Sequence, residues 1–126
     1  MREEIDAISG IESATLLYGK SEWTQFNLHP TLLQNLTNLK CTKPTVIQEQ
    51  AIEAYSRGKD VLGAAPTGSG KTLAFCVPVI DWLLKHPPKE ETSSWNVYCL
   101  IITPTRELAL QINRVVTRLC EGTKIR

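Results

Sequence analysis

The sequence has no large excess of either charge, since its 126 residues give a formal net charge of +1. A broadly basic surface for nucleic acid is thereby excluded, so any contact with phosphate must be made by a local site. Hydrophobic residues make up 42% of the chain and charged residues 21%, which excludes wholesale disorder. The length and composition indicate one globular domain or a large part of one.

Cysteine occurs four times but never in a C-x-x-C pair, and no histidine lies at metal-ligand spacing from a cysteine. This pattern excludes a zinc site and a dense disulfide framework, and it favours reduced thiols packed in the core of an intracellular protein. The four residues are Cys41, Cys76, Cys99 and Cys120. No apolar run approaches the roughly 18 residues that span a bilayer, and the N-terminus lacks the pattern of a signal peptide. We expect no membrane association.

Helical periodicity begins at Pro30, and segments 30–39, 45–56, 73–84 and 104–121 are predicted to be helices. Short apolar runs at 60–64 and 96–103 are predicted to be buried strands. Residues 1–22 are interpreted as a flank, with one loose helix at 5–17, and 86–94 as a surface loop. Alternating strands and helices predict an α/β fold with a parallel sheet flanked by helices. Because only two strands are expected, the sheet is predicted to be incomplete at the C-terminal end.

A glycine-rich segment lies between the first predicted strand and the next helix, which is where a phosphate-binding loop belongs. Its residues are Ala65, Pro66, Thr67, Gly68, Ser69, Gly70, Lys71 and Thr72. The two glycines let several backbone N–H groups face one point, and the helix adds its positive end. Lys71 would reach the β- and γ-phosphates, and the Thr72 hydroxyl would ligate Mg²⁺. The strict P-loop pattern has glycine at position 65; a simple strand-to-helix turn is the alternative, but it does not explain Lys71 and Thr72.

This segment resembles motif I of the DEAD-box RNA helicases, in which alanine is usual at the first position. Residues 104–109, Pro-Thr-Arg-Glu-Leu-Ala, resemble motif Ia, and residues 43–48, Lys-Pro-Thr-Val-Ile-Gln, resemble the Q motif. Trp23 stands where the family has an isolated upstream aromatic residue. The resemblance covers residues 23–126 and implies the N-terminal part of the first RecA-like helicase domain.

The resemblance also implies roles for single residues. The Gln48 amide would recognise the adenine edge and Trp23 would pack against the ring, although Trp23 could instead be a core aromatic and Gln48 a solvated helix residue. Pro104, Thr105 and Arg106 would contact the RNA sugar-phosphate backbone without reading its sequence. For Arg106 the alternative is a surface ion pair with the neighbouring Glu107.

The sequence departs from the family pattern in two ways. Lys40 and Cys41 stand where the Q motif commonly has glycine and an aromatic residue, which affects the expected adenine contacts. No Asp-Glu-Ala-Asp or Ser-Ala-Thr motif occurs, and no second RecA-like domain. The resemblance therefore implies the portion of an ATP-dependent RNA helicase that binds ATP, Mg²⁺ and the RNA backbone, with no hydrolysis by these residues alone.

Two other classes stay open: a non-catalytic short form that binds RNA or a partner, and a P-loop NTPase of another kind. Trp23 and the run Leu62-Gly63-Ala64-Ala65 resemble the family branch that acts in large-ribosomal-subunit assembly. That branch implies ribosome-assembly or other ribonucleoprotein partners, and a nuclear or nucleolar rather than cytoplasmic location.

Overall fold

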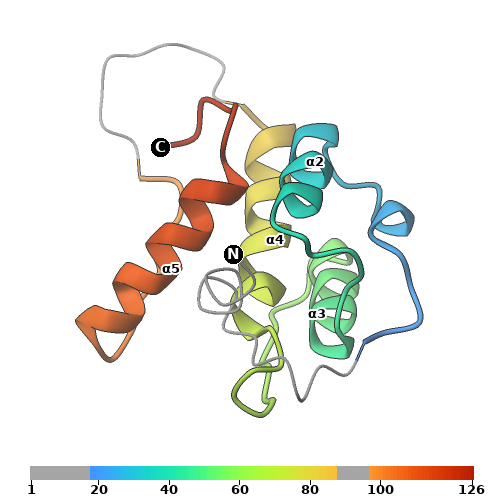
Figure 1. The fold of residues 1–126 in the computed structure, drawn as a ribbon, viewed down its shortest axis with the longest axis horizontal. Helices are drawn as coiled ribbons and strands as arrows, with labels where there is room; N and C mark the ends of the chain where they lie inside the picture. The colour runs from blue at the N-terminus through green and yellow to red at the C-terminus, as the bar shows by residue number, and fades with distance from the viewer. Residues whose placement is uncertain (1–17, 88–96) are drawn as a thin grey trace.

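The computed structural model describes residues 18–87 and 97–126, and the named elements within them are all helices (Figure 1). The elements are the 3-10 helix η1 (Trp23–Phe26) and the α-helices α2 (Pro30–Asn38), α3 (Val46–Ser56), α4 (Lys71–Lys85) and α5 (Arg106–Leu119). All four helices predicted within 30–121 are confirmed, with ends that differ by about two residues at most. The helix expected at 5–17 and most of the loop expected at 86–94 lie outside the described residues.

Local capping chemistry sets where the helices begin. Thr45 is extended at the N-cap of α3, and its backbone N–H donates to Gln48 Oε1 over 2.9 Å. Thr105 caps α5 by accepting from the Leu108 N–H at 3.2 Å. Pro30 occupies the first turn of α2, where a missing N–H costs no hydrogen bond. These caps satisfy N–H groups that have no partner within their own helix.

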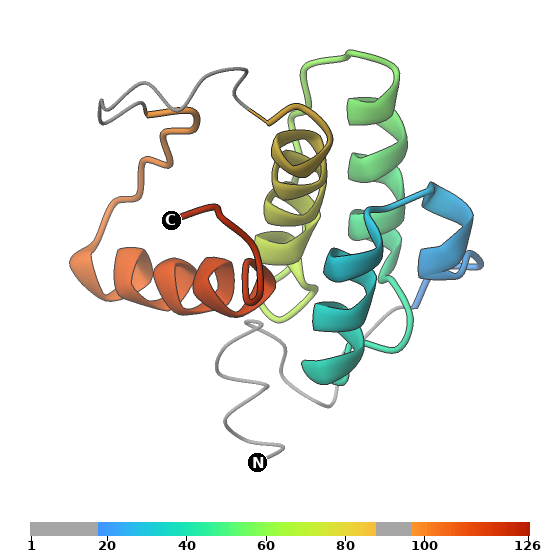
Figure 2. The same cartoon turned by 90° about the horizontal axis from the view of Figure 1, so that it is seen from above.

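Helices α3 and α4 run side by side with their N-terminal ends at the same end of the molecule (Figures 1 and 2). The C-terminal end of α5 is tied to α2, because the buried Asn35 Nδ2 donates to the carbonyls of Leu119 (2.8 Å) and Glu121 (2.9 Å). One core joins all five elements. It comprises Trp23, Leu28, Leu32, Leu36, Leu39, Ile52, Leu73, Cys76, Val77, Ile80, Ile112, Val115, Leu119 and Cys120.

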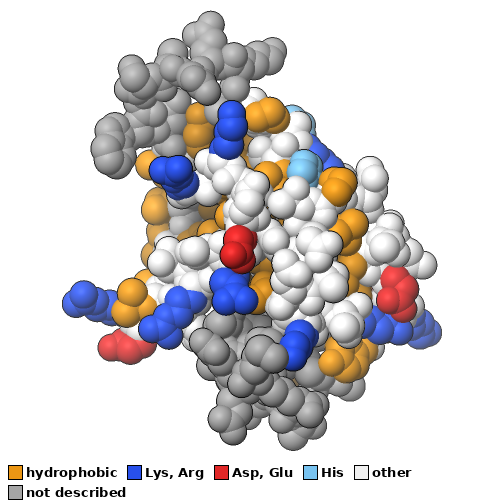
Figure 3. Space-filling model, turned by 45° about the horizontal axis from the view of Figure 1, so that its top comes forward, with side chains coloured by type: hydrophobic (Ala, Val, Ile, Leu, Met, Phe, Trp, Pro, Cys, Tyr) orange, Lys and Arg blue, Asp and Glu red, His pale blue; other side chains and the backbone are white. Residues whose placement is uncertain are grey.

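The two predicted strands are not formed in the described part of the chain. Residues 60–64 and 97–103 have no ladder hydrogen bonds there, and the only β-type pairing among described residues is an isolated bridge between Tyr18 and Thr45. A strand needs a partner for its backbone groups, and these two runs do not pair with each other. Leu62 and Ile102 are consequently exposed, at 102% and 86%, and hydrophobic side chains reach the surface in Figure 3. The parallel sheet is therefore not confirmed.

None of the described helices is long and apolar enough to cross a membrane.

Candidate nucleotide-binding site

The segment between residue 65 and the start of α4 folds as a tight turn. Gly68 and Gly70 both have φ of +83°, a left-handed conformation that favours glycine. The Ser69 N–H and hydroxyl both donate to the Pro66 carbonyl, at 3.2 and 2.6 Å. Gly70 is the N-cap of α4, so the turn delivers the chain directly into the helix. The conformation expected of the two glycines is thus present.

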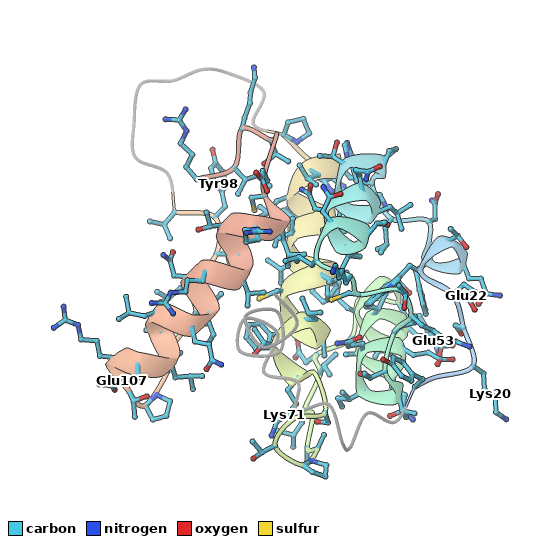
Figure 4. The ribbon with its side chains drawn as sticks, viewed as in Figure 1. Lys20, Glu22, Glu53, Lys71, Tyr98 and Glu107 are labelled. Carbon is cyan, nitrogen blue, oxygen red and sulfur yellow. The ribbon has the colours of Figure 1, made fainter. Side chains whose placement is uncertain are left out.

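Lys71 is the first residue of α4, and Figure 4 shows it at the end of the molecule where this turn lies. Its exposed ammonium donates to the Ala65 carbonyl over 2.6 Å, so the side chain folds back across the turn. In the described part of the chain no carboxylate pairs with it. Thr72 follows it and is half-buried. An ammonium has three N–H donors, so Lys71 can add an anionic partner while it holds the carbonyl.

Gln48 joins α3 to the phosphate loop. Its side chain is only 1% exposed; Oε1 accepts from the Thr45 N–H and Nε2 donates to the Gly70 carbonyl at 3.0 Å. A Cβ atom on Gly70 would collide with Gln48 Nε2. The structure therefore brings the Q-motif glutamine and the phosphate loop into direct contact, and the alternative of a solvated Gln48 is wrong.

Trp23 lies in the core rather than on an open surface. It is 6% exposed, and its indole N–H donates to the Cys41 carbonyl over 2.8 Å. The core position named as the alternative for this residue is therefore observed. Its packing against adenine stays a prediction, since that contact needs an exposed ring face.

The expected RNA-contacting residues lie at the N-terminal end of α5. Pro104, Thr105 and Arg106 are all exposed. Figure 4 places the adjoining Glu107 at the outer tip of α5, well away from Lys71. No ion pair joins Arg106 to Glu107 among the described residues, so the alternative for Arg106 is not seen. The structure does not bring this group together with the phosphate loop.

The cysteines are free, as predicted, but they differ in burial. Cys76 and Cys120 are buried and Cys41 is half-buried, whereas Cys99 is exposed and does not fit the expected core position. Burial raises the pKa of the Cys41 thiol to about 11 and that of Cys76 to about 12. The buried thiols are therefore protonated and unreactive near neutral pH.

One residue beside the site was not singled out from the sequence. Glu49 follows Gln48 in the first turn of α3, and its carboxylate accepts from the Ser21 hydroxyl at 2.6 Å and from the Lys20 N–H at 3.0 Å. The pKa of Glu49 lies below its ordinary value of 4.5, chiefly because the Ser21 hydroxyl donates to it. The only sequence signal was an acidic residue in a first helical turn, and it does not identify partners 28 and 29 residues away.

Comparison with known proteins supports the interpretation of these motifs. Residues 45–126 match the family model described as DEAD/DEAH box helicase. The chain is 46% identical over 107 residues to the ATP-dependent RNA helicase mak-5 of Neurospora crassa, covering 81% of this chain. It is 43% identical over 99 residues (79% of this chain) to the ATP-dependent RNA helicase ROK1 of Yarrowia lipolytica. It is 41% identical over 114 residues (90% of this chain) to the ATP-dependent RNA helicase drs1 of Schizosaccharomyces pombe.

The aligned regions span 13%, 18% and 15% of the lengths of these three relatives, so the chain corresponds to a small part of each. The family match nevertheless covers well over half of the chain, from the N-cap of α3 through the phosphate loop to α5. The chain therefore belongs to the DEAD/DEAH box helicase family.

Proposed function

We propose that this chain supplies the ATP-binding part, and one RNA-backbone contact, of an ATP-dependent RNA helicase that remodels RNA or RNA–protein complexes. The observation that supports this most directly is the contact between Gln48 and the Gly70 carbonyl, which joins the Q-motif helix to the phosphate loop. The three relatives named above are all ATP-dependent RNA helicases, which agrees with this proposal. In this proposal residues 1–22 are a flank, and 23–126 form the N-terminal part of a RecA-like domain with a parallel sheet.

The phosphate end of the site comprises the loop 65–72. Gly68 and Gly70 are left-handed and carry no Cβ at their own positions, and the N-terminal end of α4 offers N–H groups and its positive dipole. Lys71 would bind the β- and γ-phosphates. The described residues contain no group of three His, Cys, Asp or Glu side chains that could hold a metal. Thr72, the second residue of α4, would offer its hydroxyl to a Mg²⁺ ion held mainly by phosphate oxygens.

The adenine end would be recognised by Gln48. Each end of its carboxamide makes one hydrogen bond in the structure, which leaves one N–H and one oxygen lone pair. Because Gln48 is 1% exposed, adenine recognition requires the α3 N-terminus to open slightly. Trp23 would have to expose one face of its indole in the same step.

The RNA contact would be made by Pro104, Thr105 and Arg106 at the start of α5. All three are exposed, and a helix N-terminus is suited to bind a phosphate. A guanidinium and N–H donors bind the sugar-phosphate backbone of any sequence. This supports a general RNA contact rather than base recognition.

We propose that these residues alone do not hydrolyse ATP. These 126 residues contain no Asp-Glu-Ala-Asp motif to orient a water molecule. The resemblance of Trp23 and residues 62–65 to the large-subunit assembly branch supports a nucleolar location with ribonucleoprotein partners.

The experiment is titration of the chain with a fluorescent ATP analogue and Mg²⁺, alongside its Lys71→Ala and Gln48→Ala variants. Lys59→Ala is the matched control, because Lys59 is also exposed but lies outside the loop. Each site variant should weaken binding by about tenfold or more, since each removes a charged or buried hydrogen-bonding group. Equal affinity in all four proteins, with helical circular dichroism spectra, would contradict the proposal.

A further inference from the structure

We infer that Glu49 is a positioning residue of the nucleotide site: its carboxylate holds residues 18–22 against the first turn of α3. This inference rests on the proposed function. It concerns how the adenine side of the site is kept in place, and it assigns Glu49 no contact with nucleotide. The family resemblance does not single this residue out.

Glu49 binds the segment with both carboxylate oxygens. Oε1 accepts from the Ser21 hydroxyl at 2.6 Å, and Oε2 accepts from the Lys20 backbone N–H at 3.0 Å. Hydrogen bonds to an ionised carboxylate are about twice as strong as neutral ones. These two hydrogen bonds join Glu49 to residues that lie 29 and 28 positions earlier in the sequence.

The backbone of the same segment fits closely against the start of α3. The Gly19 N–H donates to the Pro44 carbonyl over 2.9 Å, and Tyr18 forms an isolated bridge with Thr45. A Cβ atom on Gly19 would collide with Glu49 Oε2, so the segment lies directly on the carboxylate. A side chain at position 19 would have to displace that carboxylate.

The held segment continues into the aromatic residue expected at the adenine. Glu22 pairs with Lys43 over 3.5 Å and caps η1, and Trp23 is the first residue of η1. The Trp23 indole in turn donates to the Cys41 carbonyl. Residues 18–23 are thus attached along their length to residues 41–49, and Glu49 provides the attachment at the α3 end.

On its other side Glu49 adjoins Gln48, whose amide donates to the Gly70 carbonyl. A shift of the first turn of α3 would move Gln48 relative to the phosphate loop. Figure 4 shows Lys20 and Glu22 on the outer side of α3, away from Lys71. Glu49 is thereby coupled to the adenine side through Trp23 and Gln48. Apart from the contact between Gln48 and Gly70, the phosphate turn is held by hydrogen bonds within itself, from Ser69 to the Pro66 carbonyl and from Lys71 to the Ala65 carbonyl.

The first test is titration of the 126-residue chain with a fluorescent ATP analogue and Mg²⁺, using Glu49→Ala, Glu49→Gln and the control Glu53→Ala. Glu53 is exposed one turn further along α3 and contacts Arg57 instead. The expected Kd rises about tenfold for Glu49→Ala and about threefold for Glu49→Gln, which keeps an acceptor, with no change for Glu53→Ala. Displacement of the analogue by inorganic tripolyphosphate should give the same affinity for tripolyphosphate in all four proteins.

An unchanged Kd in Glu49→Ala would overturn the inference. A loss of ATP and tripolyphosphate affinity by the same factor would also overturn it, because it would indicate a general structural role.

A second measurement does not depend on nucleotide. Hydrogen exchange of the Trp23 indole N–H, identified by its loss in Trp23→Phe, should be about tenfold faster in Glu49→Ala than in the unmodified chain or Glu53→Ala. Failure of the unmodified chain to bind ATP would refute the proposed function alone. Unchanged indole exchange would refute the role of Glu49.

Discussion

Replacing Gly70 by alanine should destabilise the chain through two separable effects. Gly70 has φ of +83°, and an alanine in the left-handed region costs about 1–2 kcal/mol. The new Cβ would also collide with Gln48 Nε2 and force this buried amide off the Gly70 carbonyl. A buried polar group that loses its partner costs about 1–3 kcal/mol. The expected total is about 2–5 kcal/mol.

Gly58→Ala is the matched control. Gly58 has φ of +71°, but a Cβ there meets nothing within 4 Å. The two substitutions share the left-handed strain and the gain from a less flexible unfolded chain, so their difference isolates the collision with Gln48. That difference should be about 1–3 kcal/mol.

The assay is urea unfolding followed by far-ultraviolet circular dichroism, with a double-mutant cycle. In a Gln48→Ala background the collision with Nε2 is removed and only a contact with Thr45 Oγ1 at 3.3 Å remains, so Gly70→Ala should cost little more than Gly58→Ala. Equal costs for the two glycine substitutions in the unmodified chain would refute the assigned contact. So would a cycle with no coupling between positions 48 and 70.

Three further predictions follow from burial and charge. Leu119→Ala removes a side chain that is 0% exposed and should lower the free energy of unfolding by about 2–5 kcal/mol. Leu110→Ala, at a side chain that is 50% exposed, should change it by about 0.5 kcal/mol or less. Urea unfolding measures both values, and equal losses would contradict the assigned core. Alkylation near pH 8, followed by peptide mass spectrometry, should modify the exposed Cys99 well before Cys76. Burial raises the pKa of the Cys76 thiol to about 12, so little reactive thiolate is present at that pH. Faster labelling of Cys76 would refute its burial. Because the pKa of Glu49 is lowered on folding, its contribution to stability should be present above its ordinary value of 4.5 and lost as pH falls through the lowered pKa. Exchange of the Trp23 indole N–H, corrected for intrinsic exchange, should therefore rise in that acidic range, and an identical rise in Glu49→Gln would refute this cause.

The helices could be predicted because their determinants are local. Thr45 and Thr105 are N-caps, Pro30 is tolerated in a first turn, and the apolar stripes that follow face the core. The strands at 60–64 and 96–103 could not be established in this way. An apolar run favours a strand, but a strand exists only when another segment completes its ladder, and the described residues provide none.

In the candidate site, too, features set by local sequence could be predicted and features set by tertiary contacts could not. The left-handed turns at Gly68 and Gly70 were predictable, since the residue types themselves select that backbone conformation. The burial of Gln48 was not, because it depends on the Gly70 carbonyl 22 residues away. Similarly, nothing local indicates that Trp23 hydrogen-bonds to Cys41 or that Glu49 binds Ser21. Sequence motifs identified the groups, and tertiary contacts determine which of them are exposed.

If Gln48 and the phosphate loop form one adenine-nucleotide site, the Kd for ATP should differ from the Kd for GTP, each measured with Mg²⁺. We expect the unmodified chain to bind ATP more tightly than GTP. Gln48→Ala should remove this preference, whereas Lys71→Ala should weaken the binding of both nucleotides. Equal affinity of the unmodified chain for the two nucleotides, or a preference that survives Gln48→Ala, would contradict such a site.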